Sequence, residues 1–146
     1  MQMFGLPAAR ADRDRIRSLL WQVIRREHPA QNRVELLRVL CVQLFSLGEV
    51  EDSLLNWEAK QSDFDAGCGI DVQLLCGAGL EETKNFLMAS RTMLANEALR
   101  YLTDCELAGD FRGFSPSLVI TQYRRYYHLD CWLEKPVRQI SNTRRL

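Results

Sequence analysis

The sequence has no long hydrophobic run, no Cys-x-x-Cys pair and no net excess of one charge. No stretch approaches the ~18 consecutive apolar residues of a membrane-spanning helix. No basic segment precedes an apolar one at the start, as it would in a signal peptide. The five cysteines are odd in number and widely scattered, unlike the paired spacings of a disulfide framework. We therefore expect a cytoplasmic protein with reduced thiols and no membrane association.

Histidine is scarce, because only His28 and His128 are present. Two imidazoles restrict both zinc binding and acid–base catalysis. His128 and Cys131 stand three positions apart, a spacing that on a helix places a thiol beside a base. No orienting amide or oxyanion hole accompanies this pair in the sequence, so we interpret Cys131 as a core residue. We expect no catalytic residue, and the protein is not expected to be an enzyme.

Two glycine-containing segments match known ligand motifs only in part. Asp63–Asp71 carries aspartates at alternating positions, as a calcium loop does, but Cys68 and Leu74 replace its glycine and its final glutamate. Gly77–Gly79 precedes a helix start, as in dinucleotide-binding folds, but the third glycine is missing and two glutamates follow. We interpret the first segment as a turn and cap, and the second as a tight connection with close backbone approach. No metal and no cofactor is predicted.

Charge is arranged in opposed blocks although the total is zero. Residues 1–40 carry eight arginines and four acids, and residues 111–146 carry seven bases and two acids. Residues 41–110 carry thirteen acids and only four bases. Surfaces of definite sign select partners and steer encounters. The distribution therefore predicts an acidic central face between two basic ends.

The apolar residues recur mainly with helical period. Steps of three and four positions predict helices over residues 10–27, 34–47, 49–61, 80–90, 95–108 and 116–133. We expect Asn32 and Gly48 to cap the second of these helices, and Ser115 with Pro116 to start the last. Residues 62–69 are expected to form a loop. Residues 70–76 alternate as in a strand but also suit one face of a helix, so both alternatives stay open.

Length and pattern together predict one domain. The 146 residues are enough for a single hydrophobic core. Six or seven helices with short connections indicate an all-α fold packed as αα-hairpins. The domain is expected to span residues 1–146, with residues 1–9 and 136–146 as flexible tails.

The leading functional hypothesis is a non-enzymatic helical protein-binding module whose acidic central face engages a basic protein partner. A concrete form is an immunity-type or antitoxin-type inhibitor that covers the basic active surface of a cytotoxic enzyme, so the partner is a toxin or another enzyme. Three of the acids, Glu51, Asp52 and Glu58, are expected to point outward, because the apolar residues of their helix turn inward. The candidate partner-binding residues are Glu49, Glu51, Asp52, Glu58, Asp63, Asp65, Glu81 and Glu82.

The alternative is a nucleic-acid-associated protein that uses its basic N- and C-terminal segments. Arg10–Arg26 forms a basic helix face, and Tyr123–His128 interleaves aromatic and basic residues, a composition that suits single-stranded nucleic acid. The zero net charge and a pI near 6.7 differ from the usual basic footprint. Tyrosines that anchor the last helix, with arginines that pair the acidic middle, explain the pattern more economically. An enzyme at the Asp63–Asp71 loop ranks third.

Overall fold

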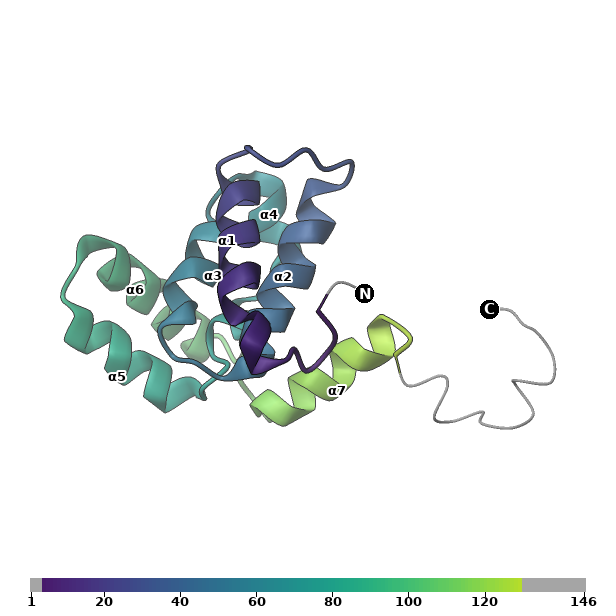
Figure 1. Cartoon of the computed structure of the whole chain (residues 1–146). Helices are drawn as coiled ribbons and strands as arrows, with labels where there is room; N and C mark the ends of the chain where they lie inside the picture. The colour runs from purple at the N-terminus through teal and green to yellow at the C-terminus, as the bar shows by residue number, and fades with distance from the viewer. Residues whose placement is uncertain (1–3, 130–146) are drawn as a thin grey trace, which may run out of the picture.

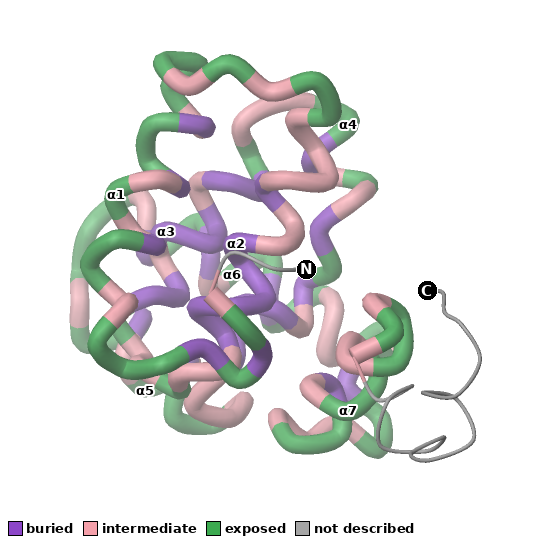
Figure 2. Tube along the Cα trace, turned by 45° about the vertical axis from the view of Figure 1, so that its right-hand side comes forward, coloured by how far each residue is buried: buried purple, intermediate pink, exposed green. Residues whose placement is uncertain are grey.

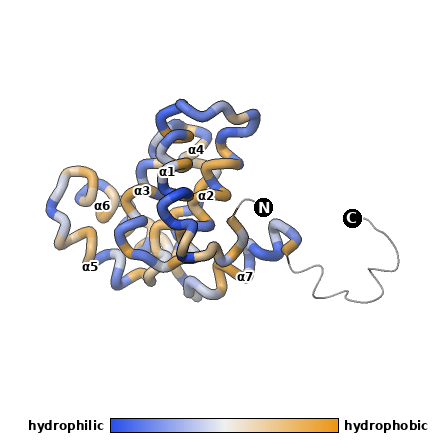
Figure 3. The backbone as a smooth tube through the Cα atoms, viewed as in Figure 1, coloured by the Kyte–Doolittle hydropathy of each residue, from blue (hydrophilic) through white to orange (hydrophobic). Residues whose placement is uncertain are grey.

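The most apolar helix, α2 (Arg33–Leu47), lies at the centre of the fold. In the computed structural model, which describes residues 4–129, it packs against α1 (Arg13–Ile24), α3 (Asp52–Lys60), α4 (Phe64–Gly69) and α7 (Pro116–Tyr126) (Figure 1). Hydrophilic residues dominate the outer helix α1, whereas hydrophobic residues run along α2 (Figure 3). A helix that is apolar on most faces must be covered on most faces, which explains its central place. The fully buried hydrophobic residues of α2 are Leu37, Leu40, Cys41, Val42 and Leu44.

The capping signals act as the sequence predicts. The Asn32 side chain accepts the Glu35 backbone N–H at 3.1 Å, and Gly48 ends α2 in the left-handed region at φ +74°. Ser115 Oγ accepts the Leu118 N–H at 3.2 Å. Side-chain caps satisfy N–H groups that the first helical turn leaves without partners. These residues therefore set where α2 begins and ends and where α7 begins.

A second hydrophobic cluster lies beside the first. Helices α5 (Leu80–Ser90) and α6 (Met93–Leu107) form an αα-hairpin, and α6 packs against α3 (Figure 1). Phe114 is half-buried and contacts both clusters, which joins them into one domain. The buried members of this cluster are Trp57, Val72, Leu75, Cys76, Leu87, Ala95, Ala98, Leu102 and Phe111. Residues 4–129 form seven α-helices and no strand, so the all-α prediction is confirmed.

The segment between α3 and α5 differs from its prediction. The sequence predicts a loop over residues 62–69, but α4 forms there because the Asp63 side chain accepts the Ala66 N–H at 2.8 Å and caps a short helix. Residues 70–76 contain neither a strand nor an α-helix, but a 3₁₀ helix, η2 (Val72–Leu75). Short 3₁₀ turns commonly connect α-helices. The interpretation of Asp63 as a cap residue is confirmed.

Three predicted helices are shorter than expected, and one of them, α3, spans Asp52–Lys60 instead of residues 49–61. The first begins as a 3₁₀ turn, η1 (Arg10–Asp12), and α1 ends at Ile24, before Arg26 adopts φ +61°. The last ends at Tyr126, and His128 adopts φ +61°. A positive φ interrupts the right-handed helix. Residues 130–133 of that prediction lie outside the described residues.

The beginning of the chain packs onto the domain. Leu6 and Ala8 are buried, and the Ala8 N–H donates to Ser46 Oγ at 2.9 Å. Gln43 Nε2 donates to the Gly5 carbonyl at 3.0 Å, and Arg124 donates to the Leu6 carbonyl. The prediction of a flexible tail is therefore wrong for residues 5–8. Residues 1–3 and the predicted tail at 136–146 lie outside the described residues.

Burial is concentrated where α1, α2 and α3 face one another (Figure 2). The outer faces of α1, α5, α6 and α7 are exposed for much of their length (Figure 2). Between residues 4 and 129, no helix is both long enough and apolar enough to cross a membrane.

Candidate functional site

The opposed charge blocks pair with each other inside the fold. Arg13 donates from Nε and Nη2 to the two carboxylate oxygens of Asp52, at 3.0 Å each, and Arg17 donates to the same carboxylate. The Asp52 side chain is only 3% exposed. The prediction that it points outward is wrong, because the face of α3 that carries Asp52 packs against α1. Asp52 fastens two helices and does not belong to an open binding face.

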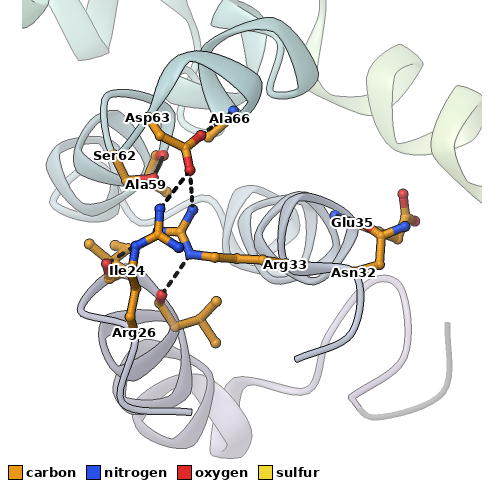
Figure 4. Close-up of polar contacts among 10 residues, drawn as sticks. Ile24, Arg26, Asn32, Arg33, Glu35, Ala59, Ser62, Asp63 and Ala66 are labelled. Atoms are coloured by element: carbon orange, nitrogen blue, oxygen red, sulfur yellow. Dashed lines mark hydrogen bonds and ion pairs between the residues drawn. The ribbon is translucent and has the colours of Figure 1, made fainter. Parts of the chain in front are cut away.

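Asp63 is engaged in the same way (Figure 4). Its Oδ2 accepts from Arg26 at 2.9 Å and from Arg33 at 2.8 Å, while its Oδ1 caps α4. Arg33 also donates to the Val23 and Ile24 carbonyls at the end of α1. The Ala66 N–H and the two guanidinium groups lower the pKa of Asp63. This carboxylate therefore connects α1, α2 and α4.

Other predicted acids carry weaker pairs nearer the surface. Glu49 pairs with Arg10, and this contact lowers the pKa of Glu49. Glu51 Oε1 lies 3.9 Å from Arg13 Nη2, and Glu81 Oε2 lies 3.0 Å from Lys84 Nζ. Exposed pairs of this kind contribute little to stability. They nevertheless reduce the negative charge that these acids present to a partner.

The expected negative patch over residues 49–82 is therefore interrupted by arginines from α1 and α2. Of the predicted partner-binding acids in this patch, Glu58, Asp65 and Glu82 form no ion pair among residues 4–129. They lie on α3, α4 and α5, three separate elements.

Carboxylates without ion pairs gather instead around Tyr101 of α6. A hollow of about 390 Å³ has Glu97, Tyr101 and Asp104 of α6 in its wall, together with the base Arg100 of the same helix and Trp57 of α3. An adjoining hollow of about 330 Å³ shares Tyr101 and includes Asp71 and Asp110. Within residues 4–129, none of these four acids pairs with a base. We call Tyr101 with Asp71, Glu97, Asp104 and Asp110 the Tyr101 surface.

The ring of Tyr101 is held in place although it is 40% exposed. Its centroid lies 5.2 Å from that of the buried Trp57 ring, at an interplanar angle of 43°. Lys60 Nζ lies 5.6 Å from the Tyr101 centroid. The Lys60 ammonium donates to the Gly67 carbonyl at 2.7 Å and to the Ile70 carbonyl, and burial lowers its pKa. Lys60 therefore supports both Tyr101 and the end of α4.

The basic segment of α7 also contacts the domain. Tyr123 OH donates to Asp71 Oδ2 at 3.2 Å, and burial raises the pKa of Tyr123. The Arg38 guanidinium lies 5.6 Å from the Tyr126 ring centroid. Tyr123 packs against the hydrophobic cluster around α2, so its predicted role as an anchor of the last helix is confirmed. Among residues 4–129, the arginines that pair with Asp52 and Asp63 are Arg13, Arg17, Arg26 and Arg33, which all precede the acidic middle in the chain.

The glycine and cysteine motifs serve packing. A Cβ on Gly77 would lie 2.5 Å from the Phe45 carbonyl oxygen, which confirms the interpretation of a tight connection. Cys41 and Cys76 are buried free thiols, and burial raises the pKa of Cys76 to about 12. The helix that would align His128 with Cys131 ends at Tyr126. Cys131 itself lies outside the described residues.

The charge pattern of the sequence identified the acidic block but did not single out Glu97, Asp104, Asp110 or Tyr101. Glu97, Tyr101 and Asp104 follow one another at steps of four and three positions, which places them on one helix face. That spacing was the available signal on α6. Asp71 and Asp110 join them only through tertiary packing. No protein-family model, no curated protein and no solved structure matches this chain.

Proposed function

We propose that this protein is a non-enzymatic protein-binding module that engages a basic protein partner through the Tyr101 surface. One observation carries the proposal: four carboxylates that form no ion pair among residues 4–129 share two hollows with the exposed Tyr101, while Asp52 of α3 and the Asp63 cap of α4 pair with arginines. The concrete form that we favour is an immunity-type or antitoxin-type inhibitor that covers the basic active surface of a cytotoxic enzyme.

The physical properties of the Tyr101 surface suit such a role. The four carboxylates outnumber the two bases in these walls, Lys60 and Arg100, and the remaining negative charge raises association rates with a basic partner. Tyrosine and tryptophan are enriched among the residues that dominate interface energetics. Because Trp57 and Lys60 already hold the Tyr101 ring, little side-chain entropy is lost when a partner covers it.

The charge pairs favour a protein partner over nucleic acid. Arg10, Arg13 and Arg17 of the basic N-terminal segment pair with carboxylates of the same chain. Affinity for a phosphate backbone depends on bases that neutralise phosphates and release counterions. Guanidinium groups that are already paired within the fold contribute less to that effect.

A capture experiment with charge-matched variants tests the proposal. Glu97→Lys, Asp104→Lys and Asp110→Lys are combined in one bait, and Asp14→Lys, Asp65→Lys and Glu82→Lys in a control bait. All six acids are exposed and form no ion pair among residues 4–129, so the two baits carry the same change in net charge.

We expect the wild type and the control bait to retain one basic protein from the native host, identified by mass spectrometry. The Tyr101-surface bait should lose it, with an association rate at least about tenfold lower for the purified pair. Equal retention by both baits would contradict the assignment of the surface. Recovery of nuclease-sensitive material in place of a protein would favour the nucleic-acid alternative.

A further inference from the structure

A separate groove lies between α1 and α3. It has a volume of about 430 Å³, and its walls include Arg17 and Trp21 of α1 and Leu54, Leu55 and Glu58 of α3. Trp21 is 40% exposed. An exposed tryptophan beside leucines is the kind of apolar surface that marks an interaction site. None of these residues belongs to the Tyr101 surface.

The α1 side of this groove is basic. Arg17, Trp21 and Arg25 follow one another at four-residue steps, so they lie along one face of the helix and its end. The Arg25 guanidinium lies 5.9 Å from the Trp21 ring centroid. Arg25 also pairs with Glu27 at 3.1 Å, but both side chains are 55% exposed, and an exposed pair of this kind is weak. The exposed tryptophan thus lies between Arg17, which already pairs with Asp52 of the same chain, and Arg25, which follows the end of α1.

The α3 side is acidic. Glu51 and Glu58 stand in the wall of the groove. Glu58 is half-buried, forms no ion pair among residues 4–129, and its pKa is raised by burial. A partly desolvated carboxylate without a base is unfavourable unless a cation joins it. The groove therefore offers an apolar floor between a basic edge and an acidic edge.

We propose that this groove is a dimer interface that docks a second copy of this chain across a two-fold axis. A two-fold contact brings the same patch of both copies together. The two α1 helices then run antiparallel, with each Trp21 in the groove of the other copy. Arg25 of each copy faces the acids Glu51 and Glu58 of the other. A second copy brings Arg25 to Glu58, the groove carboxylate that forms no ion pair among residues 4–129, and this charge complementarity is the reason for choosing it as the occupant.

The first test measures the oligomeric state by analytical ultracentrifugation over a range of micromolar concentrations. We expect the wild type to dimerise and Trp21→Ala to raise the dimer dissociation constant by at least about 30-fold, as expected when a hot-spot residue is truncated. Phe64→Ala is the control, because Phe64 is 82% exposed on α4 and lies outside the groove. Its dimerisation should match that of the wild type. A wild type that stays monomeric overturns the proposal.

The second test uses charge reversal and mixing. Arg25→Glu and the pair Glu51→Lys with Glu58→Lys should each weaken dimerisation, because each places like charges across the interface. In a mixed dimer of the two variant proteins, the introduced glutamate of one copy faces the introduced lysines of the other. At the second contact, the native Arg25 faces the native acids. We therefore expect mixing to restore dimers. Failure to restore them, while both variants keep the wild-type circular dichroism spectrum, overturns the two-fold geometry.

A different occupant would give a different result. If the wild type is monomeric while Trp21→Ala abolishes capture of a host protein, the groove belongs to a heterologous interface and the dimer proposal is wrong. Dimerisation and capture through the Tyr101 surface are measured with different variants, so one proposal can fail while the other stands.

Discussion

Asp52 receives both arms of the Arg13 guanidinium at 3.0 Å, although the two residues stand 39 positions apart in the chain. A bidentate pair of this kind has a fixed geometry and stronger hydrogen bonds than a neutral pair. The Arg13 pKa is raised by its hydrogen bond to Asp52. The sequence suggests that the basic and acidic blocks form separate external faces. Instead, the Arg13–Asp52 pair joins them and fixes the position of α1 on α3.

Reversal of Asp52 should destabilise the domain. Asp52→Lys buries a cation beside Arg13 and Arg17, and we expect a loss of about 3–5 kcal/mol in the free energy of unfolding, as when a buried pair is broken. Glu51→Lys is the control, because the Glu51 side chain is 61% exposed, and it should change stability by less than about 0.5 kcal/mol. Urea denaturation measures both. Equal stability of the two variants would show that Asp52 does not fasten the helices.

The Asp63 carboxylate should make stability depend on pH in the acid range. Because its pKa is lowered in the folded state, the unfolded state binds more protons between the two pKa values. The stabilisation is therefore present above the unfolded pKa of about 3.9 and is lost as pH falls through the folded pKa. Asp63→Asn keeps a capping oxygen but removes the charge. Asp63→Asn should therefore be less stable than the wild type near neutral pH, and the difference in melting temperature between the two proteins should shrink as pH falls.

A second substitution at the same site separates capping from charge. Asp63→Ala removes the oxygen that accepts the Ala66 N–H. This substitution should lower the free energy of unfolding by a further amount of about 0.5–2 kcal/mol. That additional loss should persist at low pH, where the charge no longer contributes. A deficit of Asp63→Asn that stays constant with pH would contradict the assigned pKa shift.

Gly77 should not tolerate a side chain. A Cβ there would meet the backbone of Phe45, which cannot move without disturbing the end of α2. Gly77→Ala should therefore lower the free energy of unfolding by about 1–3 kcal/mol, as overpacking does. Gly67→Ala is the matched control. Its Cβ would lie 3.5 Å from the Lys60 carbonyl, an ordinary contact, and a helical alanine is favoured by up to about 1 kcal/mol. Opposite signs for the two substitutions in urea denaturation would confirm this account.

Lys60 should be required for the order of the α4–η2 segment. Lys60→Met removes the donor that serves the Gly67 and Ile70 carbonyls. Leaving buried acceptors without a partner costs about 1–3 kcal/mol. Relative to the wild type, backbone hydrogen exchange should then accelerate more in residues 64–75 than in α2. Uniform exchange throughout the domain would instead indicate a general loss of stability.

The fold was largely predictable because its signals are local. Helical period together with the caps at Asn32, Gly48 and Ser115 located helices that the structure confirms. Helix α4 was missed because it has only six residues, two of them glycine, and is formed by the Asp63 cap and by packing against α2 and α3. A segment of this length is too short for a helical period of apolar residues to be recognised.

The candidate site was less predictable because pairing is a tertiary property. Counting charges along the chain treats every carboxylate as available, and it gave Asp52 and Asp63 the same weight as Glu58. Which acids are neutralised depends on α1 lying against α3 and on Arg33 reaching the start of α4. Of the features of the Tyr101 surface, only the helical spacing of Glu97, Tyr101 and Asp104 could be recognised in the sequence.

The hydrogen bond from Arg124 to the Leu6 carbonyl spans 118 positions, which bears on how the protein is made. A chain leaves the ribosome from its N-terminus, and early segments fold first. Leu6 must therefore wait for α7 before this contact forms, while α1 and α2 already have each other as partners. A nascent chain that stalls before residue 116 would lack the contact between α7 and Leu6, although the contacts of Gly5 and Ala8 with α2 need only segments that are already made.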